Sequence, residues 1–284
     1  MPPPVLPSSI PLLLRAAFKR GARLPTGGTE LVRTTYRVDR IDHRQLDRYN
    51  RALGFADGTL PVTFLYLLAQ RAHLASMLRP GVPFRIAGMI HVANELAELY
   101  PVAADAPLDL ATVVTMAPPQ ANGAVHVLLS TMGKQDGKAV FSSTSEYLAV
   151  RGQRGSASSR TAGPALPELG RWTLSRSAGR AYARVSSDWN PIHLWSSTAR
   201  LMGMRAPIIH GMHTVGKACA LLEAQGGRRV RAISARFKAP IALPGEAVLS
   251  TDLATHSYAV LSQGREAVSG EFEWAAATSG QHAA

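Results

Sequence analysis

The second half of the chain shows first helical and then strand-like spacing of its apolar residues. Over about 177–186 and about 211–224 they recur every three or four positions, which predicts a short helix and a longer, more apolar one. Gly226 and Gly227 are suited to end the longer helix. Extended segments are predicted at about 172–174, 229–242, 247–257 and 265–275.

The first half has the same order of elements. A short helix is predicted at about 43–53 and a long apolar helix at about 63–78. Extended segments follow at about 84–100, 108–116, 124–131 and 138–150. Pro61-Val62-Thr63-Phe64 matches Pro207-Ile208-Ile209-His210 at an offset of 210 − 64 = 146 residues. These similarities indicate a duplication, with each half an antiparallel sheet wrapped around a long central helix.

A segment rich in Gly, Ser, Pro and Arg separates the two halves at 151–170 and is predicted to be a linker. The expected organisation is an N-terminal extension, a first repeat, the linker, a second repeat and a tail, at 1–30, 31–150, 151–170, 171–276 and 277–284.

The formal charge of +12 raises the question of a nucleic-acid partner. The arginines are scattered, with no long basic run and few aromatic residues between them, so an anionic small ligand is favoured over nucleic acid. The single cysteine, Cys219, excludes an intrachain disulfide and fits a reducing cytoplasm. No apolar stretch approaches the roughly 18 to 20 residues of a membrane span, and no basic region precedes Ile10–Leu14 as in a secretory signal. We therefore expect a cytoplasmic protein without membrane contact.

Candidate chemistry is concentrated in Ser187-Asp188-Trp189-Asn190-Pro191-Ile192-His193. A carboxylate and an imidazole in one loop, at Asp188 and His193, can converge on a water molecule, and Asn190 can hold either group in place. Gly211 is predicted to open the long helix, where a backbone N–H without an intrahelical partner could stabilise an oxyanion.

The alternative interpretation is that this loop is only structural, because Asp and Asn before proline commonly build turns. The first half provides an internal comparison. Between its two predicted helices it has only Gly54-Phe55-Ala56-Asp57-Gly58-Thr59-Leu60 before Pro61, without an Asn-Pro-x-His sequence. A motif needed only for folding should serve both halves, so its presence in one half favours a single active site.

Three stretches of the second half resemble the MaoC-like, or R-specific hydratase 2, family of enoyl-CoA hydratases. They are Y-A-R-V-S-S-D-W-N-P-I-H-L, T-A-R-L-M-G-M-R-A-P-I-I-H-G-M and F-K-A-P-I-A-L-P-G, within about 171–274. The resemblance implies an α+β double hot dog fold, with two antiparallel sheets each wrapped around a long central helix. A degenerate N-terminal repeat would pack beside a catalytic C-terminal one.

The resemblance also implies a hydro-lyase of fatty acid metabolism that reversibly hydrates a trans-2-enoyl-CoA to an (R)-3-hydroxyacyl-CoA. Asp188 and His193 would activate water, Asn190 would help to orient it, and the Gly211 N–H would bind the thioester carbonyl. Coenzyme A or an acyl-carrier protein would carry the acyl group, without a metal or redox cofactor. Many members have Asp two residues after the histidine, where this chain has Trp195; we expect this to alter loop packing rather than remove the chemistry.

Other functions stay open at this stage. A hot dog acyl-CoA thioesterase would not need the Asp-x-Asn-Pro-x-His loop, and a non-catalytic acyl-thioester binding subunit would require Trp195 or a closed pocket to abolish activity. The degenerate half is expected to widen the site for an acyl chain through its apolar helix. The oligomeric state is also open, with a homodimer as one arrangement.

Several other residues invite a role. A metal site built from Asp188, His193, His210 and His213 is a weaker interpretation, because two histidines three apart at a helix start are a poor ligand set. His210 is expected to be buried and hydrogen-bonded, His213 partly exposed, and Cys219 part of the core. The basic residues that could meet CoA phosphates, without one being singled out, are Lys217, Arg236 and Lys238.

Overall fold

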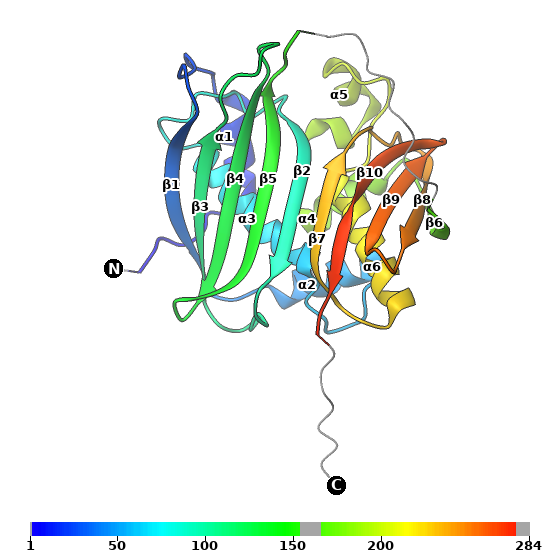
Figure 1. The fold of residues 1–284 in the computed structure, drawn as a ribbon. Coiled ribbons are helices and arrows are strands. Elements are labelled where there is room, and N and C mark those ends of the chain that lie inside the picture. Colours follow the sequence, from blue (N-terminus) through cyan, green and yellow to red (C-terminus); the bar gives the residue numbers. More distant parts are fainter. Residues whose placement is uncertain (1, 154–165, 277–284) are drawn as a thin grey trace.

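Two long helices lie against one face of a ten-stranded antiparallel sheet in the computed structural model, which describes residues 2–153 and 166–276 (Figure 1). The helices are α3 (Val62–Met77) and α6 (Gly211–Gly226), each of 16 residues. The strands are β1 (Thr29–Val38), β2 (Ile90–Glu98), β3 (Leu108–Met116), β4 (Val125–Gln135), β5 (Lys138–Val150), β6 (Glu168–Leu174), β7 (Val230–Phe237), β8 (Gly245–Asp252), β9 (Ser257–Ser262) and β10 (Arg265–Trp274). The shorter helices are α1 (Ser9–Phe18), α2 (His43–Leu53), α4 (Ala178–Ser186) and α5 (Ser196–Leu201), with a 3-10 turn at Pro191–His193.

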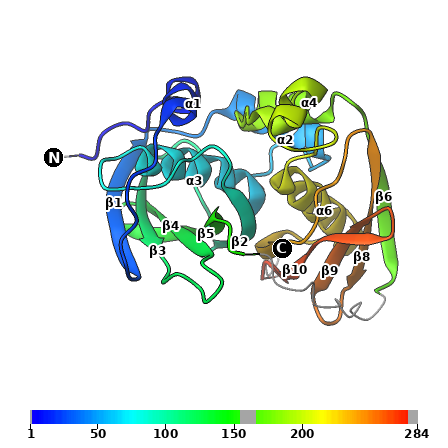
Figure 2. The same ribbon diagram turned by 90° about the horizontal axis from the view of Figure 1, so that it is seen from above.

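The sheet order confirms the duplication. Strands run β1-β3-β4-β5-β2 in the first half and β7-β10-β9-β8-β6 in the second, so each half has the same order when read outward from the centre. Strands β2 and β7 pair antiparallel from Ala93↔Arg236 to Ala97↔Ala232 and join the halves edge to edge. Each half-sheet curves around its own long helix (Figure 2). The predicted double hot dog fold is therefore confirmed, and its two sheets are continuous.

The long helices form because they are apolar on nearly every side and can be enclosed by the sheet. In α3, 13 of 16 residues are buried. At 16 residues, both are shorter than the roughly 20 residues needed to cross a bilayer, and no helix in the described parts of the chain is long and apolar enough to do so. Their starts lie 211 − 62 = 149 residues apart, so the offset of 146 read from the sequence misaligns them by about one turn.

Some strands and helices were not predicted. The segment predicted at 247–257 ends earlier, because the Asp252 side chain accepts hydrogen bonds from the N–H groups of Ala254 (2.9 Å) and Thr255 (3.4 Å) and turns the chain. A fourth strand, β9, therefore follows where three extended segments were expected after α6. Two further elements had no sequence prediction: α1 and β1.

The N-terminal extension lies across the first half. Leu6, Leu12 and Ala16 are buried, and Lys19 Nζ donates to the carbonyl oxygens of Met77 (2.6 Å) and Val82 (2.7 Å). These contacts attach α1 to the end of α3.

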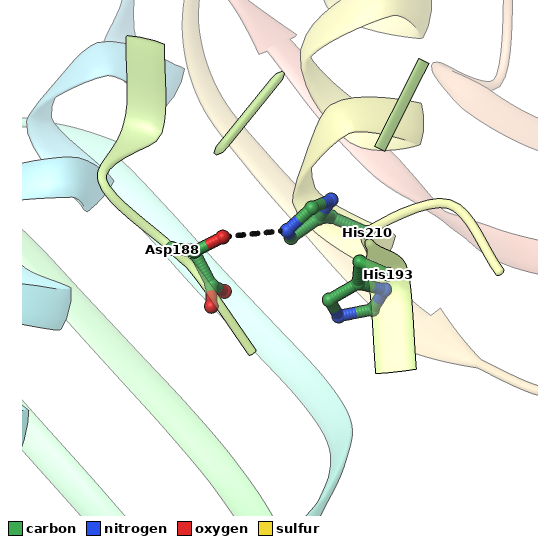
Figure 3. A group of neighbouring side chains, drawn as sticks. All are labelled: Asp188, His193 and His210. Atoms are coloured by element: carbon green, nitrogen blue, oxygen red, sulfur yellow. Dashed lines mark hydrogen bonds between the residues drawn. The ribbon is translucent and has the colours of Figure 1, made fainter. Parts of the chain in front are cut away.

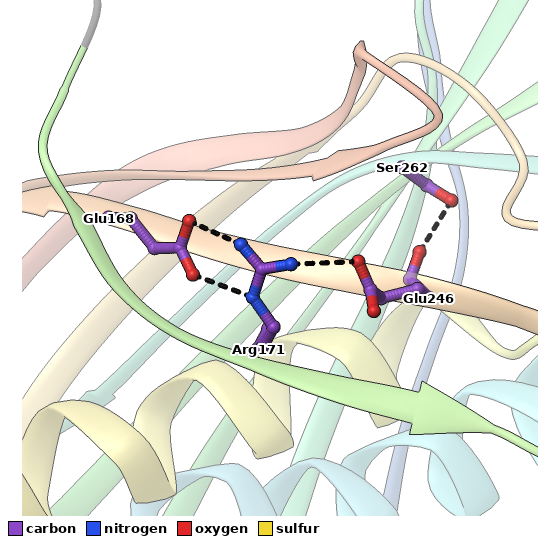
Figure 4. A network of polar contacts seen from close by, with 4 residues as sticks. All are labelled: Glu168, Arg171, Glu246 and Ser262. Carbon is purple, nitrogen blue, oxygen red and sulfur yellow. Dashed lines mark hydrogen bonds and ion pairs between the residues drawn. The ribbon is translucent and has the colours of Figure 1, made fainter.

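The predicted linker falls mainly outside the described residues, as does the tail at 277–284. The last three residues of the predicted linker, 168–170, instead begin strand β6. Arg171 of β6 pairs with Glu168 at 2.8 Å and with Glu246 of β8 at 3.4 Å, and Ser262 Oγ donates to the Glu246 carbonyl oxygen at 2.7 Å (Figure 4). These exposed contacts link edge strand β6 to β8 and β9.

Gly270 of β10 allows close packing next to the junction of the halves, because a Cβ there would lie 2.0 Å from the Ser234 carbonyl oxygen of β7. We predict that Gly270→Ala lowers the free energy of unfolding by about 2 kcal/mol or more, since a strand backbone must shift to admit the methyl group. Chemical denaturation measures this change. The control is Gly170→Ala in edge strand β6, where the nearest atom would be 3.8 Å away. Equal stability of the two variants would contradict the prediction.

Candidate active site

The loop between α4 and α6 begins where a left-handed residue ends α4 and the chain changes direction. Helix α4 ends at Ser187, which has a left-handed backbone with φ of 61°. Asn190 Oδ1 then accepts from the Ile192 N–H at 3.4 Å, and Pro191 opens the 3-10 turn that ends at His193. Residues 187–195, named here the Asp188–His193 loop, are thus shaped by short-range hydrogen bonds and proline. Asn190 Oδ1 is engaged in this turn.

Asp188, His193 and His210 lie close together at the N-terminal end of α6 (Figure 3). Each offers one oxygen or nitrogen within 4.8 Å of the others, and the two imidazole rings stack with centroids 3.7 Å apart. His193 Nδ1 lies 2.8 Å from the Ile208 carbonyl oxygen. Because that oxygen can only accept, Nδ1 carries the hydrogen, and Nε2 of neutral His193 is the nitrogen able to accept a proton.

His210 is hydrogen-bonded to the backbone of the Asp188–His193 loop. Its side chain is only 2% exposed, and its Nε2 donates to the Asp188 carbonyl oxygen at 2.9 Å. The expectation that His210 is buried and hydrogen-bonded is therefore confirmed.

The Asp188 carboxylate receives one hydrogen bond on each oxygen. Oδ1 accepts from the Asn190 N–H at 3.2 Å, and Oδ2 accepts from Gln70 Nε2 at 2.9 Å. Gln70 belongs to α3, in the other half of the chain. The halves therefore meet at this carboxylate, and the Asp188 side chain is held in one orientation.

Burial and neighbouring groups determine the charges of Asp188, His193 and His210. Burial lowers the pKa of His193 and, with a further contribution from His193, lowers that of His210 to about 3, so both imidazoles are neutral at pH 7. Burial alone would raise the pKa of Asp188, but His210, His193, Gln70 and the Asn190 N–H together hold it below its ordinary value. An ionised carboxylate therefore lies beside a neutral imidazole.

Gly211 is the first residue of α6, as predicted, and directly follows His210. Its N–H lies in the first turn, where no intrahelical acceptor exists, and no other acceptor for it occurs within 2–153 and 166–276. A Cβ at this position would lie 2.5 Å from the Phe237 ring. Glycine therefore allows the aromatic ring to pack against the helix start.

The contribution of the first half was not predicted from the sequence. Its long helix was expected to offer an apolar surface, yet it presents Gln70 to Asp188, and Tyr66 lies one turn away on the same face. The one signal available was a polar residue within the apolar run L-L-A-Q-R-A. No motif relates it to a loop 118 residues away.

Other predicted residues have separate surroundings. His213 is partly exposed, as expected, and does not belong to the group formed by Asp188, His193 and His210. Cys219 is fully buried in the core, also as expected. Trp195 is 50% exposed and precedes α5.

Two of the three basic candidates, Lys217 and Lys238, have partners in the protein, whereas the Arg236 side chain has none among the described residues. Lys217 Nζ donates to the Leu53 carbonyl oxygen at 3.0 Å, and Lys238 pairs with Glu266 at 2.5 Å. Lys217 also lines a cavity of about 630 Å³ beside α4 and β6, which is bounded by Tyr182 and His213 and contains none of Asp188, Asn190, His193 and Gly211.

Comparison with known proteins identifies the family of this chain. The family described as MaoC like domain matches residues 166–257. The chain is 31% identical over 238 residues to 3-hydroxyacyl-thioester dehydratase Y of Mycobacterium tuberculosis, covering 79% of this chain and 76% of that protein. The chain belongs to the MaoC-like dehydratase family. It is therefore an enzyme of the hydro-lyase class.

Two further similarities cover most of this MaoC-like dehydratase. It is 27% identical over 252 residues to 3-hydroxyacyl-thioester dehydratase X of Mycobacterium tuberculosis, covering 86% of this chain and 88% of that protein. The crystal structure of HtdX from the same organism superposes with a TM-score of 0.69 at 22% identity, over 85% of this chain and 100% of the other. The structural match supports the double hot dog fold across both halves.

Gly179 of α4 is a sensitive position in this dehydratase, because a Cβ there would lie 2.0 Å from the His193 carbonyl oxygen. We predict that Gly179→Ala displaces the 3-10 turn and lowers hydro-lyase activity at least about tenfold, since shifts of an ångström at a reacting group are costly. Steady-state kinetics and thermal unfolding should be measured on the same preparation.

Ala181→Gly in the same helix is the matched control. Ala181 is exposed, and glycine there costs about 1 kcal/mol of helix stability without approaching His193. If Ala181→Gly lost as much activity as Gly179→Ala, the effect would be general destabilisation and the prediction would be wrong.

Proposed function

We propose that this enzyme reversibly hydrates trans-2-enoyl-CoA to (R)-3-hydroxyacyl-CoA, or runs the reverse dehydration, in fatty acid metabolism. The observation that carries the proposal is the convergence of the Asp188 carboxylate and the His193 imidazole, within 4.8 Å, beside the start of α6. The dehydratase relatives support the same reaction class.

In the proposed mechanism the thioester carbonyl oxygen accepts a hydrogen bond from the Gly211 N–H. Negative charge develops on this oxygen as water adds to C3, and the positive end of the α6 dipole stabilises it there. Removing one such donor in other enzymes costs about 3 to 4 kcal/mol of transition-state stabilisation. The N–H therefore makes its strongest contribution when the charge forms.

Asp188 and His193 carry out the proton transfers. His193 Nε2 and the ionised Asp188 carboxylate hold the water, one of them accepting its proton as the oxygen bonds to C3. The proton is then delivered to C2, so one water is consumed and both groups return to their starting states. Delivery of the oxygen to C3 and of the proton to C2 from the same face of the double bond gives the syn addition expected for an (R)-3-hydroxy product. Asn190 positions the carboxylate through its N–H and orders the turn through its side chain.

The proposed reaction needs no metal or redox cofactor. Asp188, His193 and His210 also have the donor types of a divalent metal site, but hydrogen bonds already reach both carboxylate oxygens, His193 Nδ1 and His210 Nε2. We propose coenzyme A or an acyl-carrier protein as the carrier of the acyl group and the cytoplasm as the location.

The first test follows the loss of enoyl-thioester absorbance when the purified enzyme meets short and medium trans-2-enoyl-CoAs. We predict rapid loss with the wild type and a reduction of at least about 100-fold in Asp188→Asn and in His193→Ala, as expected for general acid and base groups. Excess chelator should leave the wild-type rate unchanged.

Three outcomes would count against the proposal. Absence of hydration at every chain length, on both carriers, would favour an acyl-thioester binding subunit. Release of free thiol would indicate a thioesterase. Loss of activity in chelator, restored by one divalent metal, would assign the three-residue group to metal binding.

The pH profile tests the contact between the halves. Burial lowers the pKa of His193 from its ordinary value of about 6.5, and the pKa of Asp188 also lies below its ordinary value. As both groups take up protons, kcat/KM should therefore fall on the acid side at pH values below about 6.5. Gln70→Leu removes a hydrogen bond to the ionised Asp188 and so raises its pKa. We predict that this variant moves the acid limb to higher pH by up to about one unit.

Gln45→Leu is the matched control for Gln70→Leu. Gln45 Nε2 donates to the Val185 carbonyl oxygen at 2.7 Å, so its removal also breaks a hydrogen bond between the halves but does not touch the carboxylate. The acid limb should stay in place. A shift of equal size in both variants would show that Gln70 acts only through stability.

A further inference from the structure

We propose that the acyl group of the substrate carries an uncharged oxygen, as a hydroxyl or keto group, which binds a buried polar cluster supplied by the N-terminal half. This cluster consists of Tyr66, Gln70, His73, His91 and Tyr147. The inference rests on the proposed function, because it places the reacting C3 atom at Asp188 and His193.

The cluster begins as a polar stripe on an otherwise apolar helix. Tyr66, Gln70 and His73 follow one another by four and three residues in α3, and such positions share one helix face. Gln70 bonds to Asp188 at 2.9 Å, so this face is turned toward the Asp188–His193 loop. His73 lies about 4.5 Å farther along the helix axis than Gln70.

Two strands of the first half complete the cluster. His91 of β2 and Tyr147 of β5 are direct cross-strand partners, and their rings stack with centroids 4.5 Å apart. The Tyr66 ring also stacks on His91, with centroids 6.0 Å apart. Burial and then the Tyr147 hydroxyl raise the pKa of Tyr66, and Asp188 also contributes. The aromatic groups thus lie within electrostatic range of the carboxylate.

Three ring nitrogens of the cluster's two imidazoles lack partners. His73 is 1% exposed, and within residues 2–153 and 166–276 neither of its ring nitrogens has a hydrogen-bond partner; the same holds for the buried Nε2 of His91. Buried polar atoms in proteins are nearly always hydrogen-bonded, and leaving them unpaired is destabilising. A leucine or phenylalanine would pack there without this cost, so the imidazoles indicate recognition of a polar group.

The charge state of His73 and His91 limits which chemical groups the cluster can bind. Burial lowers the pKa of His73 to about 3 and that of His91 to about 4, so both are neutral at pH 7 and each offers one donor and one acceptor. Neither imidazole would offer a positive charge to a carboxylate, and an alkyl chain would leave their nitrogens unpaired. With the thioester at Gly211 and C3 at Asp188, the cluster would meet the chain beyond C3.

The test compares two thioesters of nearly equal shape, 5-hydroxy-trans-2-hexenoyl-CoA and 5-methyl-trans-2-hexenoyl-CoA, with unsubstituted trans-2-hexenoyl-CoA as the reference. We expect the wild type to prefer the hydroxy substrate over the methyl substrate at least about tenfold in kcat/KM, since a site built for a hydroxyl rejects an analogue that cannot pair with it. In His73→Leu and in His91→Phe the ratio should fall toward one. In Leu68→Met, a volume-conserving change elsewhere on α3, it should be kept.

Stability gives an independent readout. His73→Leu removes two unpaired nitrogens, so its melting temperature should be equal to or above that of the wild type, whereas a core role for His73 predicts a lower one. A wild-type preference for the methyl substrate, or a ratio unmoved in His73→Leu, would overturn the inference while hydration itself stands. Absence of hydration of these thioesters and of every other chain length, on both carriers, would instead overturn the proposed function.

Discussion

Strands β2 and β7 pair at the centre of the sheet, and the active-site geometry depends on this contact. Five residue pairs, Ala93↔Arg236 to Ala97↔Ala232, hold the two half-sheets in one antiparallel sheet. With the register set, α3 and α6 lie side by side on one face (Figure 2). Gln70 of the first half can therefore reach Asp188 of the second. The carboxylate is oriented by a residue that its own repeat does not contain.

The two repeats have diverged in the connection between their helices. Eight residues, 54–61, join α2 to α3, whereas 24 residues, 187–210, join α4 to α6. Lengthening a surface loop costs little in chain entropy, about 0.6 kcal/mol for each doubling. The longer loop could thus acquire the Asp188–His193 segment while the sheet order stayed the same in both halves. The first half, free of such a loop, instead faces the site with the side chains of α3.

Burial gives these side chains their chemical character. His193 and His210 are nearly enclosed, which keeps them neutral, and the Asp188 carboxylate stays ionised because hydrogen bonds reach both of its oxygens. The same exclusion of water strengthens any hydrogen bond that the Gly211 N–H makes to a substrate oxygen. The candidate site therefore combines an ionised carboxylate, neutral imidazoles and the Gly211 N–H.

The sequence by itself determined the long helices, most strands, the duplication and the Asp188–His193 loop, because helical spacing, strand composition and turn residues act over a few neighbours along the chain. His193, Asp188 and Gly211 could be identified because the motif and the helix start that contain them are local. The short strand β9 was missed because the Asp252 turn interrupts a run of strand-forming residues. Tertiary structure alone decided that Gln70 meets Asp188 and that Tyr66 stacks on His91, since the fold brings together segments far apart in the sequence. It also decided that His193 and His210 are neutral, because burial is a property of the whole packed molecule and not of the residues beside them in the chain.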